Sequence, residues 1–177
     1  MAITKIQSES LNLADDFAFT GTITGAGESN TPAFLAKLSS AQTVSFSSTT
    51  KLQADSEVFD TDNCYDNATN YRFTPTTAGK YYVYCNIVGR VGADDNWKTT
   101  QMDLYKNGSR IWRVVGTGLF DQVGNLGQAY ISTVVDMNGS SDYLEVYGFI
   151  LGSGGTPEFS AGTNGGESYF GAYLLTT

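Results

Sequence analysis

VFDTDNCYDNATNYRFTPTTAGKYYVYCNIV, residues 58–88, is the stretch that decides the fold of this chain. Its last nine residues, KYYVYCNIV, place successive side chains on opposite faces if they form a strand. One face then carries Tyr81, Val83, Cys85 and Ile87, and the other carries Tyr82, Tyr84, Asn86 and Val88. Because both faces are largely apolar, we expect two covering layers, the core of the domain and a neighbouring chain. The alternative is a strand enclosed wholly by its own sandwich.

Turn signals separate similar apolar-rich runs on both sides of this stretch. Asn107-Gly108 lies between DLYK and SRIWRVV, and Asn138-Gly139 lies between ISTVVDM and DYLEVYGFIL. Asn-Gly favours a two-residue hairpin turn, which needs positive φ at both central residues, so we expect a hairpin at each site. We find no convincing helical periodicity and no internal repeat. Many short strands with regular turns predict an all-β sandwich, jelly roll or barrel.

Composition narrows the classes of function. The 177 residues carry a net charge of −8, and without a basic patch we expect no nucleic-acid partner. No stretch is long and apolar enough to span a bilayer, so we expect no membrane insertion. The sequence contains no histidine, which excludes Ser-His-Asp and Cys-His nucleophiles as well as His-ligated metals. We therefore expect a protein that is not an enzyme, needs no cofactor and works by binding.

The first thirty residues predict a separate arm. Residues 10–27 alternate in polarity next to glycines, which indicates one or two short strands, and GAGESNTP then reads as a linker. We place the boundary near residue 31, between an arm (1–31) and a domain (32–177). An arm this short cannot bury Phe17, Phe19 and Ile23 alone, so we expect these three side chains to anchor it on another surface.

The start of the sequence, MAITKIQSESLNLADD, lacks the charged and apolar regions of a signal peptide. We therefore expect a protein made in a host cytoplasm and assembled there into a virus particle. In that compartment Cys64 and Cys85 are expected to be reduced thiols, with a disulfide between them as the alternative.

A family resemblance rests on the motif Tyr65-Asp66, Thr69, Phe73, Gly79 and Tyr81-Tyr82. This pattern resembles the globular head of complement component 1q, a relative of the tumour necrosis factor fold. Three companions occur in the expected order: PAFLAKLS at 32–39, DLYKNGSRI at 103–111 and SYFGAYLL at 168–175. Two departures lie in one loop, where Asn70-Tyr71 replaces a single Gly and Ala78 replaces a common Pro.

The resemblance covers residues 32–177 and implies a ten-stranded jelly roll that forms a homotrimer around its three-fold axis. The side chains that it places at the trimer interface are Tyr82, Tyr84, Tyr169 and Tyr173. Separately, the arm resembles N-terminal segments of bacteriophage fibre and structural proteins. That similarity implies attachment to other virion proteins through Phe17, Phe19 and Ile23.

Other candidate sites are weaker. Loop carboxylates at Asp60, Asp62, Asp66, Asp94 and Asp95 are candidates for calcium, because calcium favours oxygen ligands and some members of the family bind it. Solvated loop acids are the commoner explanation, and the spacing is not that of an EF-hand. Trp97 follows a polar loop and is our candidate for ligand contact, whereas Trp112 lies in a strand, where core packing is expected.

The leading functional hypothesis is a trimeric virion protein, either a head or tail fibre or a capsid decoration. The arm would attach it to the particle, and the jelly-roll head would decorate the surface or bind a host glycan or protein. The alternative is a secreted or cell-surface trimeric binding module of a bacterium, similar to a lectin. An enzyme ranks third.

Overall fold

The computed structural model describes residues 30–92, 96–117, 125–162 and 167–177, and this part of the chain contains strands and no helix. Consequently it has no helix that is long and apolar enough to cross a membrane. The strands are β1 (Ala33–Lys37), β2 (Gln42–Thr43), β3 (Thr50–Lys51), β4 (Ser56–Asp60), β5 (Tyr65–Asp66), β6 (Arg72–Phe73), β7 (Ala78–Arg90), β8 (Asn96–Lys106), β9 (Ser109–Thr117), β10 (Leu126–Asn138), β11 (Leu144–Ser153), β12 (Glu158–Phe159) and β13 (Tyr169–Thr176).

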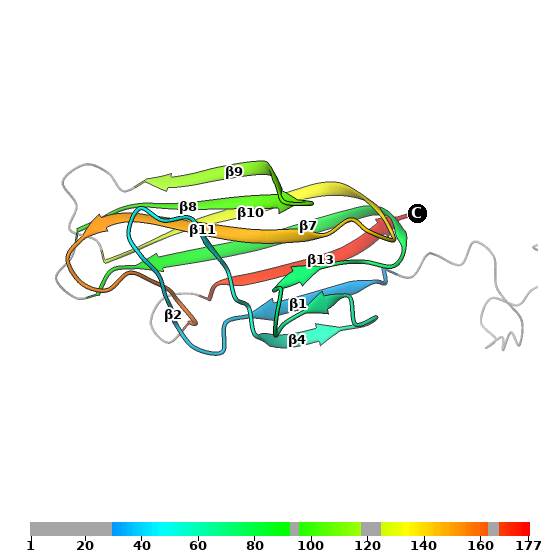
Figure 1. Ribbon diagram of the computed structural model, residues 1–177, viewed down its shortest axis with the longest axis horizontal. Coiled ribbons are helices and arrows are strands. Elements are labelled where there is room, and N and C mark those ends of the chain that lie inside the picture. Colours follow the sequence, from blue (N-terminus) through cyan, green and yellow to red (C-terminus); the bar gives the residue numbers. More distant parts are fainter. Residues whose placement is uncertain (1–29, 93–95, 118–124, 163–166) are drawn as a thin grey trace, which may run out of the picture.

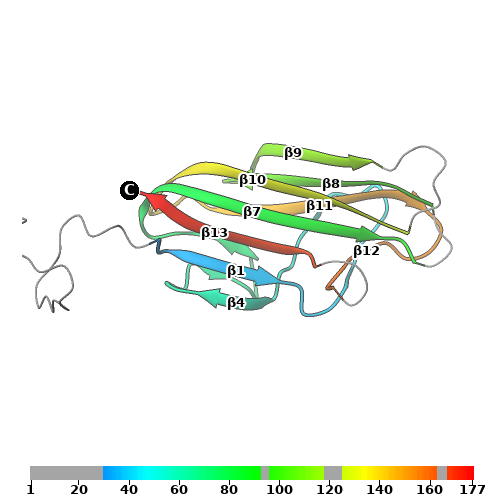
Figure 2. The same ribbon diagram turned by 180° about the vertical axis from the view of Figure 1, so that it is seen from behind.

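The strands form two sheets packed face to face, as Figures 1 and 2 show from opposite sides. The first, the β7 sheet, has the order β2-β12-β7-β13-β1-β4, with β10 paired to the other side of β7. The second, the β11 sheet, has the order β5-β6-β11-β8-β9, with β3 also paired to β11. All pairs are antiparallel, and the predicted jelly roll is confirmed. The described residues give thirteen strands where the resemblance implied ten, and five of the thirteen have only two residues.

The predicted alternation of residues 80–88 is confirmed in β7. Its inward face, the set Tyr81, Val83, Cys85 and Ile87, is fully buried between the sheets. β7 pairs over its whole length with β10 and over Lys80–Asn86 with β13, so it lies inside its sheet. An interior strand with this inward face supplies a large part of the hydrophobic stabilisation of the sandwich.

One end of the core is aromatic. The Phe34 ring stacks on Tyr65 with a centroid separation of 4.6 Å and on Phe73 at 4.7 Å, and it meets Phe170 edge-on at 4.9 Å. The Tyr65 hydroxyl donates a hydrogen bond to the carbonyl oxygen of Ala54, 3.1 Å away, so its polar atom is satisfied inside the core. Residues from β1, β5, β6 and β13 thus meet at one cluster that ties both sheets together.

The two Asn-Gly turns have different outcomes. Asn107 and Gly108 have φ of 52° and 74°, and the predicted hairpin between β8 and β9 is confirmed. The hairpin predicted at Asn138-Gly139 is wrong, because β10 pairs with β7 and the next strand, β11, pairs with β8 in the other sheet. Gly139 is needed there for a close approach, since a Cβ would lie 2.2 Å from the backbone nitrogen of Ala78.

Two carboxylates organise the loop from β4 to β6. Asp60 accepts hydrogen bonds from the backbone N–H groups of Cys64 and Tyr65, at 3.1 and 2.8 Å. Asp66 accepts from the N–H groups of Thr69 and Asn70, at 2.9 and 3.1 Å, and of Ala68 at 3.1 Å. The acidic side chains of this loop therefore act first as acceptors for turn backbone.

The cysteines are both buried and free. Burial raises the pKa of the Cys85 thiol to about 12, and burial together with the neighbouring Asp60 raises that of Cys64 further. Both thiols are protonated at neutral pH, as expected for packing residues and not for nucleophiles.

Trp112 corrects a second expectation. It is 52% exposed and not in the core. Its cross-strand partner Leu104 is fully buried, whereas Trp112 lies one strand further out, on the edge strand β9 at the margin of the core.

We expect Phe34→Ala to destabilise the protein by about 3–5 kcal/mol, because it leaves a cavity at the centre of the aromatic cluster. Val58→Ala, at a side chain that is 54% exposed, is the matched control and should change the free energy of unfolding by less than about 0.5 kcal/mol. Chemical denaturation followed by fluorescence measures both. Equal losses in the two variants would contradict the cluster's role.

We expect Asp66→Ala to cost about 1–3 kcal/mol at pH 7, because three backbone N–H groups lose their acceptor. Hydrogen bonds from Thr69 above all, with further ones from Asn70 and Ala68, lower the pKa of Asp66 to about 2. Its contribution is complete above the unfolded-state pKa of about 3.9 and is lost as the pH falls towards 2. The stability gap between wild type and variant should therefore close over this interval, and Asp62→Ala should show no comparable gap at pH 7.

Candidate functional site

The outer face of the β7 sheet carries a cluster of four tyrosines, Tyr82, Tyr84, Tyr169 and Tyr173, which we call the tyrosine face. Its rings are in mutual contact, with centroid separations of 5.4 Å for Tyr82–Tyr173 and 6.2 Å for Tyr84–Tyr169. Figure 2 looks onto the strands that bear them, β7 and β13. The structure thus brings together all the residues that the sequence assigned to a trimer interface.

Strand register explains this cluster. Tyr173 lies directly opposite Tyr82, and Gly171 lies opposite Tyr84. A Cβ on Gly171 would come within 2.4 Å of the Tyr84 ring, so the glycine leaves the space in which that ring lies flat against β13. Adjacent aromatic side chains on paired strands stabilise the sheet and also form a continuous apolar surface.

Tyr84 and Tyr169 of the tyrosine face keep their phenol protons at neutral pH. Partial burial, with the neighbouring phenols of Tyr169 and Tyr173, raises the pKa of Tyr84. Partial burial likewise raises the pKa of Tyr169. The hydroxyl groups therefore remain hydrogen-bond donors, and the rings present apolar area with a polar tip, as tyrosines at protein interfaces do.

β10 extends the same surface with residues that the sequence prediction missed. Val134 pairs with Tyr82 and Tyr130 pairs with Asn86, and these side chains are 49% and 64% exposed. The alternation in AYISTVV could have revealed them, because Ala129, Ile131 and Val135 face the core and leave Tyr130 and Val134 outside. Lys80 and Asp136 close one end of this surface with an ion pair of 2.6 Å.

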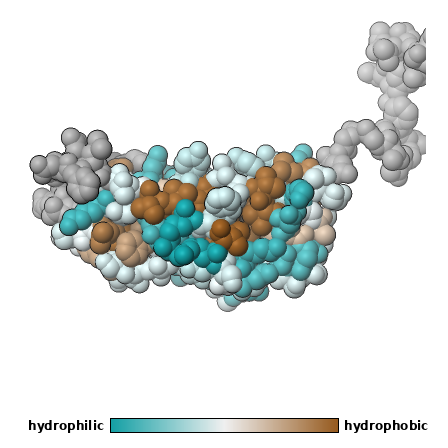
Figure 3. Space-filling model, turned by 90° about the horizontal axis from the view of Figure 1, so that it is seen from above, coloured by the Kyte–Doolittle hydropathy of each residue, from teal (hydrophilic) through white to brown (hydrophobic). Residues whose placement is uncertain are grey.

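A second apolar group lies on the edge of the sandwich. Ile111, Trp112 and Val115 of β9 are all exposed. Figure 3 looks onto this edge and shows brown hydrophobic patches between hydrophilic ones. β9 approaches β10 closely here, since a Cβ on Gly116 would lie 2.2 Å from the carbonyl oxygen of Gln128. We call the exposed side chains of Ile111, Trp112 and Val115 the β9 edge.

Trp97, the candidate for ligand contact, is half-buried and has structural partners. Its indole N–H donates to the hydroxyl of Thr100 at 2.8 Å, and Thr100 donates in turn to the carbonyl oxygen of Gly127 at 3.1 Å. The indole ring lies over Gly127, where a Cβ would lie 1.8 Å from it. Trp97 therefore joins β8 to β10, and the ligand contact expected of it stays a prediction.

The candidate calcium ligands among the described residues have different structural roles. Asp60 and Asp66 hold loop backbone as described above, and Asp62 is exposed. Within the described residues, no three acidic, cysteine or histidine side chains are grouped so as to hold a metal ion. Asp94 and Asp95 lie outside the described residues, as do the arm residues Phe17, Phe19 and Ile23.

Comparison with known proteins shows the fold of the domain alone. No protein-family model and no curated protein sequence matches the chain. Among solved structures, the Eiger tumour necrosis factor of S. frugiperda matches 81% of this chain and 90% of its own, with a TM-score of 0.53 and 12% identity. Murine APRIL matches 81% of this chain and 98% of its own, with a TM-score of 0.57 and 11% identity. The described domain therefore has the jelly-roll fold shared by tumour necrosis factor and complement component 1q heads.

Proposed function

We propose that this chain is a homotrimeric structural protein of a virus particle that displays its jelly-roll head and acts by binding, without catalysis. The observation that carries the proposal is the tyrosine face, a surface cluster of four half-buried aromatic rings. Aromatic clusters at the surface are common at sites of protein association. A second copy of the same chain is the occupant that we propose.

Two different apolar surfaces on one chain support the proposed trimer. The tyrosine face lies on the outside of the β7 sheet, and the β9 edge lies beside β10 at its margin. If the edge of one copy packs on the tyrosine face of the next, the contact is heterologous, and such contacts form closed rings when the rotation permits. A closed ring of three copies matches the homotrimer that the family resemblance implies.

The virion setting is supported by the sequence of the arm, which resembles segments of bacteriophage fibre and structural proteins. In this proposal Phe17, Phe19 and Ile23 attach the trimer to other virion proteins. The heads then decorate the particle or contact a glycan or protein of the host. Three equivalent heads on one trimer add their weak contacts through avidity.

The lectin-like alternative, a secreted or cell-surface bacterial binding module, shares the trimer and differs in its setting. A polar pocket lined by other residues than the tyrosine face favours a ligand-binding role in either setting. Catalysis is third, because a chain without histidine lacks the common nucleophile systems and metal ligands.

We expect the double substitution Tyr84→Asp/Tyr173→Asp to convert the trimer to a folded monomer, because two charges would be buried in the interface. Tyr105→Asp/Tyr147→Asp is the matched control. These two rings are also half-buried and in contact, at 4.6 Å, but lie on the β11 sheet. Sedimentation velocity measures the mass of each variant in solution, and circular dichroism shows whether the variant is folded. A wild-type monomer, or a first variant that remains a trimer, would refute the proposal.

Removal of residues 1–30 should leave a folded trimer that is no longer incorporated into particles. The experiment compares the full chain with the shortened one by quantitative mass spectrometry of purified particles assembled in the host. A copy number divisible by three is expected for the full chain. Equal incorporation of both chains would contradict the role given to the arm, and absence of the full chain from particles would contradict the virion setting.

A further inference from the structure

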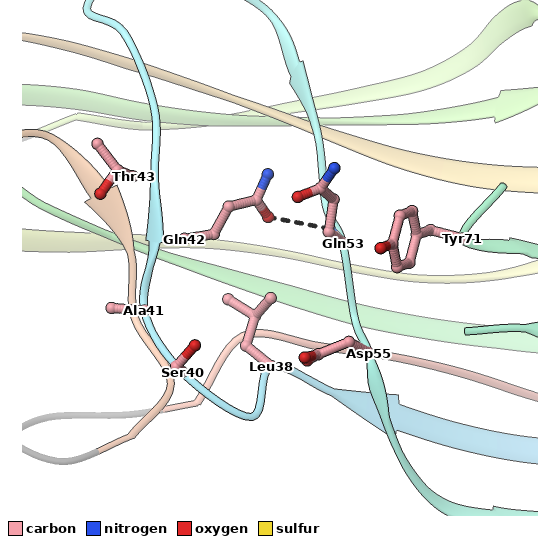
Figure 4. Close-up of a pocket in the computed structure, with 8 residues that line it drawn as sticks. All are labelled: Leu38, Ser40, Ala41, Gln42, Thr43, Gln53, Asp55 and Tyr71. Atoms are coloured by element: carbon pink, nitrogen blue, oxygen red, sulfur yellow. Dashed lines mark hydrogen bonds between the residues drawn. The ribbon is translucent and has the colours of Figure 1, made fainter. Parts of the chain in front are cut away.

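A shallow polar pocket lies where the chain crosses from β1 to β4 (Figure 4). Its cavity volume is about 270 Å³, and its lining consists of Leu38, Ser40, Ala41, Gln42, Thr43, Gln53, Asp55 and Tyr71. These residues come from three segments: residues 38–43 after β1, the link from β3 to β4, and the residue before β6. None of them belongs to the tyrosine face or the β9 edge.

The polar groups of the pocket are held in place and still have bonding capacity. The Gln42 side-chain oxygen accepts from the N–H of Gln53 at 2.9 Å, and its nitrogen donates to the carbonyl oxygen of Lys51 at 2.8 Å. The amide plane is thereby fixed, with its second N–H left over. The side-chain amide of Gln53 has no hydrogen-bond partner among the described residues.

Asp55 supplies the charge of the pocket. Its two carboxylate oxygens accept from the N–H and the hydroxyl of Ser39, at 2.7 and 2.5 Å. Partial burial acts to raise the pKa of Asp55, but the hydrogen bonds from Ser39 outweigh it and hold the pKa below its ordinary value. The carboxylate is therefore ionised at neutral pH, and each oxygen keeps lone pairs for a further donor.

Tyr71 is the unusual member of this pocket. Its φ is 49°, in the left-handed region that non-glycine residues with bulky side chains rarely adopt. It is half of the Asn70-Tyr71 pair that stands where the related motif has a single Gly. A strained backbone that places an aromatic ring at a pocket suggests a functional reason for the strain.

We propose that this pocket binds a single neutral sugar ring. A sugar offers vicinal hydroxyl groups, which donate to Asp55 and exchange hydrogen bonds with Gln42 and Gln53, and a C–H face, which suits the ring of Tyr71 and the floor at Leu38. The carboxylate of Asp55 and the net charge of −8 disfavour acidic sugars. The small volume admits one ring at a time.

The inference deepens the proposed function, on which it rests for its setting, because it names a ligand class for the displayed head. A single site of this size is expected to be weak, with a dissociation constant on the order of 1 mM. Three heads on one trimer convert such weak sites into useful attachment to a surface coated with glycans.

The test is saturation-transfer NMR and calorimetry of the full chain with galactose, glucose, mannose, N-acetylglucosamine and fucose, and with glucuronic acid as the acidic counterpart. At least one neutral sugar should bind, and glucuronic acid should bind about tenfold more weakly or not at all. Tyr71→Gly should lower the affinity about tenfold or more without lowering the melting temperature, because glycine adopts positive φ without strain.

Ser47→Gly is the matched control, since Ser47 has φ of 58° and does not line the pocket. It should relieve strain equally and leave sugar binding unchanged. Absence of binding for all five neutral sugars at about 50 mM, well above the expected dissociation constant, would overturn the inference. Unchanged affinity in Tyr71→Gly would overturn it as well. Because these experiments use the isolated protein, their failure is distinct from failure of the particle assay.

Discussion

β7 lies in the interior of its sheet with aromatic or aliphatic side chains on both of its faces. Its inward face, with Tyr81 and Ile87, is covered by the β11 sheet, and this packing closes the sandwich. On its outward face Asn86 and Val88 are buried, whereas Tyr82 and Tyr84 are only half-buried. The fold and the proposed assembly therefore arise from one constraint, which is that a strand apolar on both sides needs two neighbours.

The proposed association surface and the ligand-binding pocket are built from different residues, and they adjoin where Leu38 follows Lys37, the strand partner of Tyr169. The tyrosine face is made by two long, paired strands, so its geometry depends on regular register. The pocket is made by short segments that link β1 to β4 and by Tyr71, where regular pairing is interrupted. A rigid sheet suits a broad contact between copies, whereas irregular backbone suits a few directed polar groups.

The features that follow from local pattern were predictable from the sequence. Alternation along residues 80–88 placed Tyr82 and Tyr84 on the face opposite the core, and positive φ at Asn107-Gly108 was expected for a hairpin. The same dipeptide at Asn138-Gly139 led to a wrong prediction of a hairpin, because the strand that pairs with β11 is determined by the rest of the sheet and not by the turn. The prediction that Trp112 packs in the core was wrong for a related reason, since the position of a strand at the edge is a property of the assembled sheet. The pocket joins residues 38–43, Gln53, Asp55 and Tyr71, which come together only in the folded chain, so no local pattern reveals it.

The place of the last strand has a consequence for how the domain forms during synthesis. β13 lies between β7 and β1, and Phe34 of β1 pairs with Ala172 of β13. Until the ribosome releases residues 169–176, β1 and β4 have no sheet to join, and the aromatic cluster lacks Phe170. Such pairing between distant parts of the chain makes folding slow compared with helical proteins. The domain is thus completed only after β13 has been translated, and the proposed association between copies follows that step.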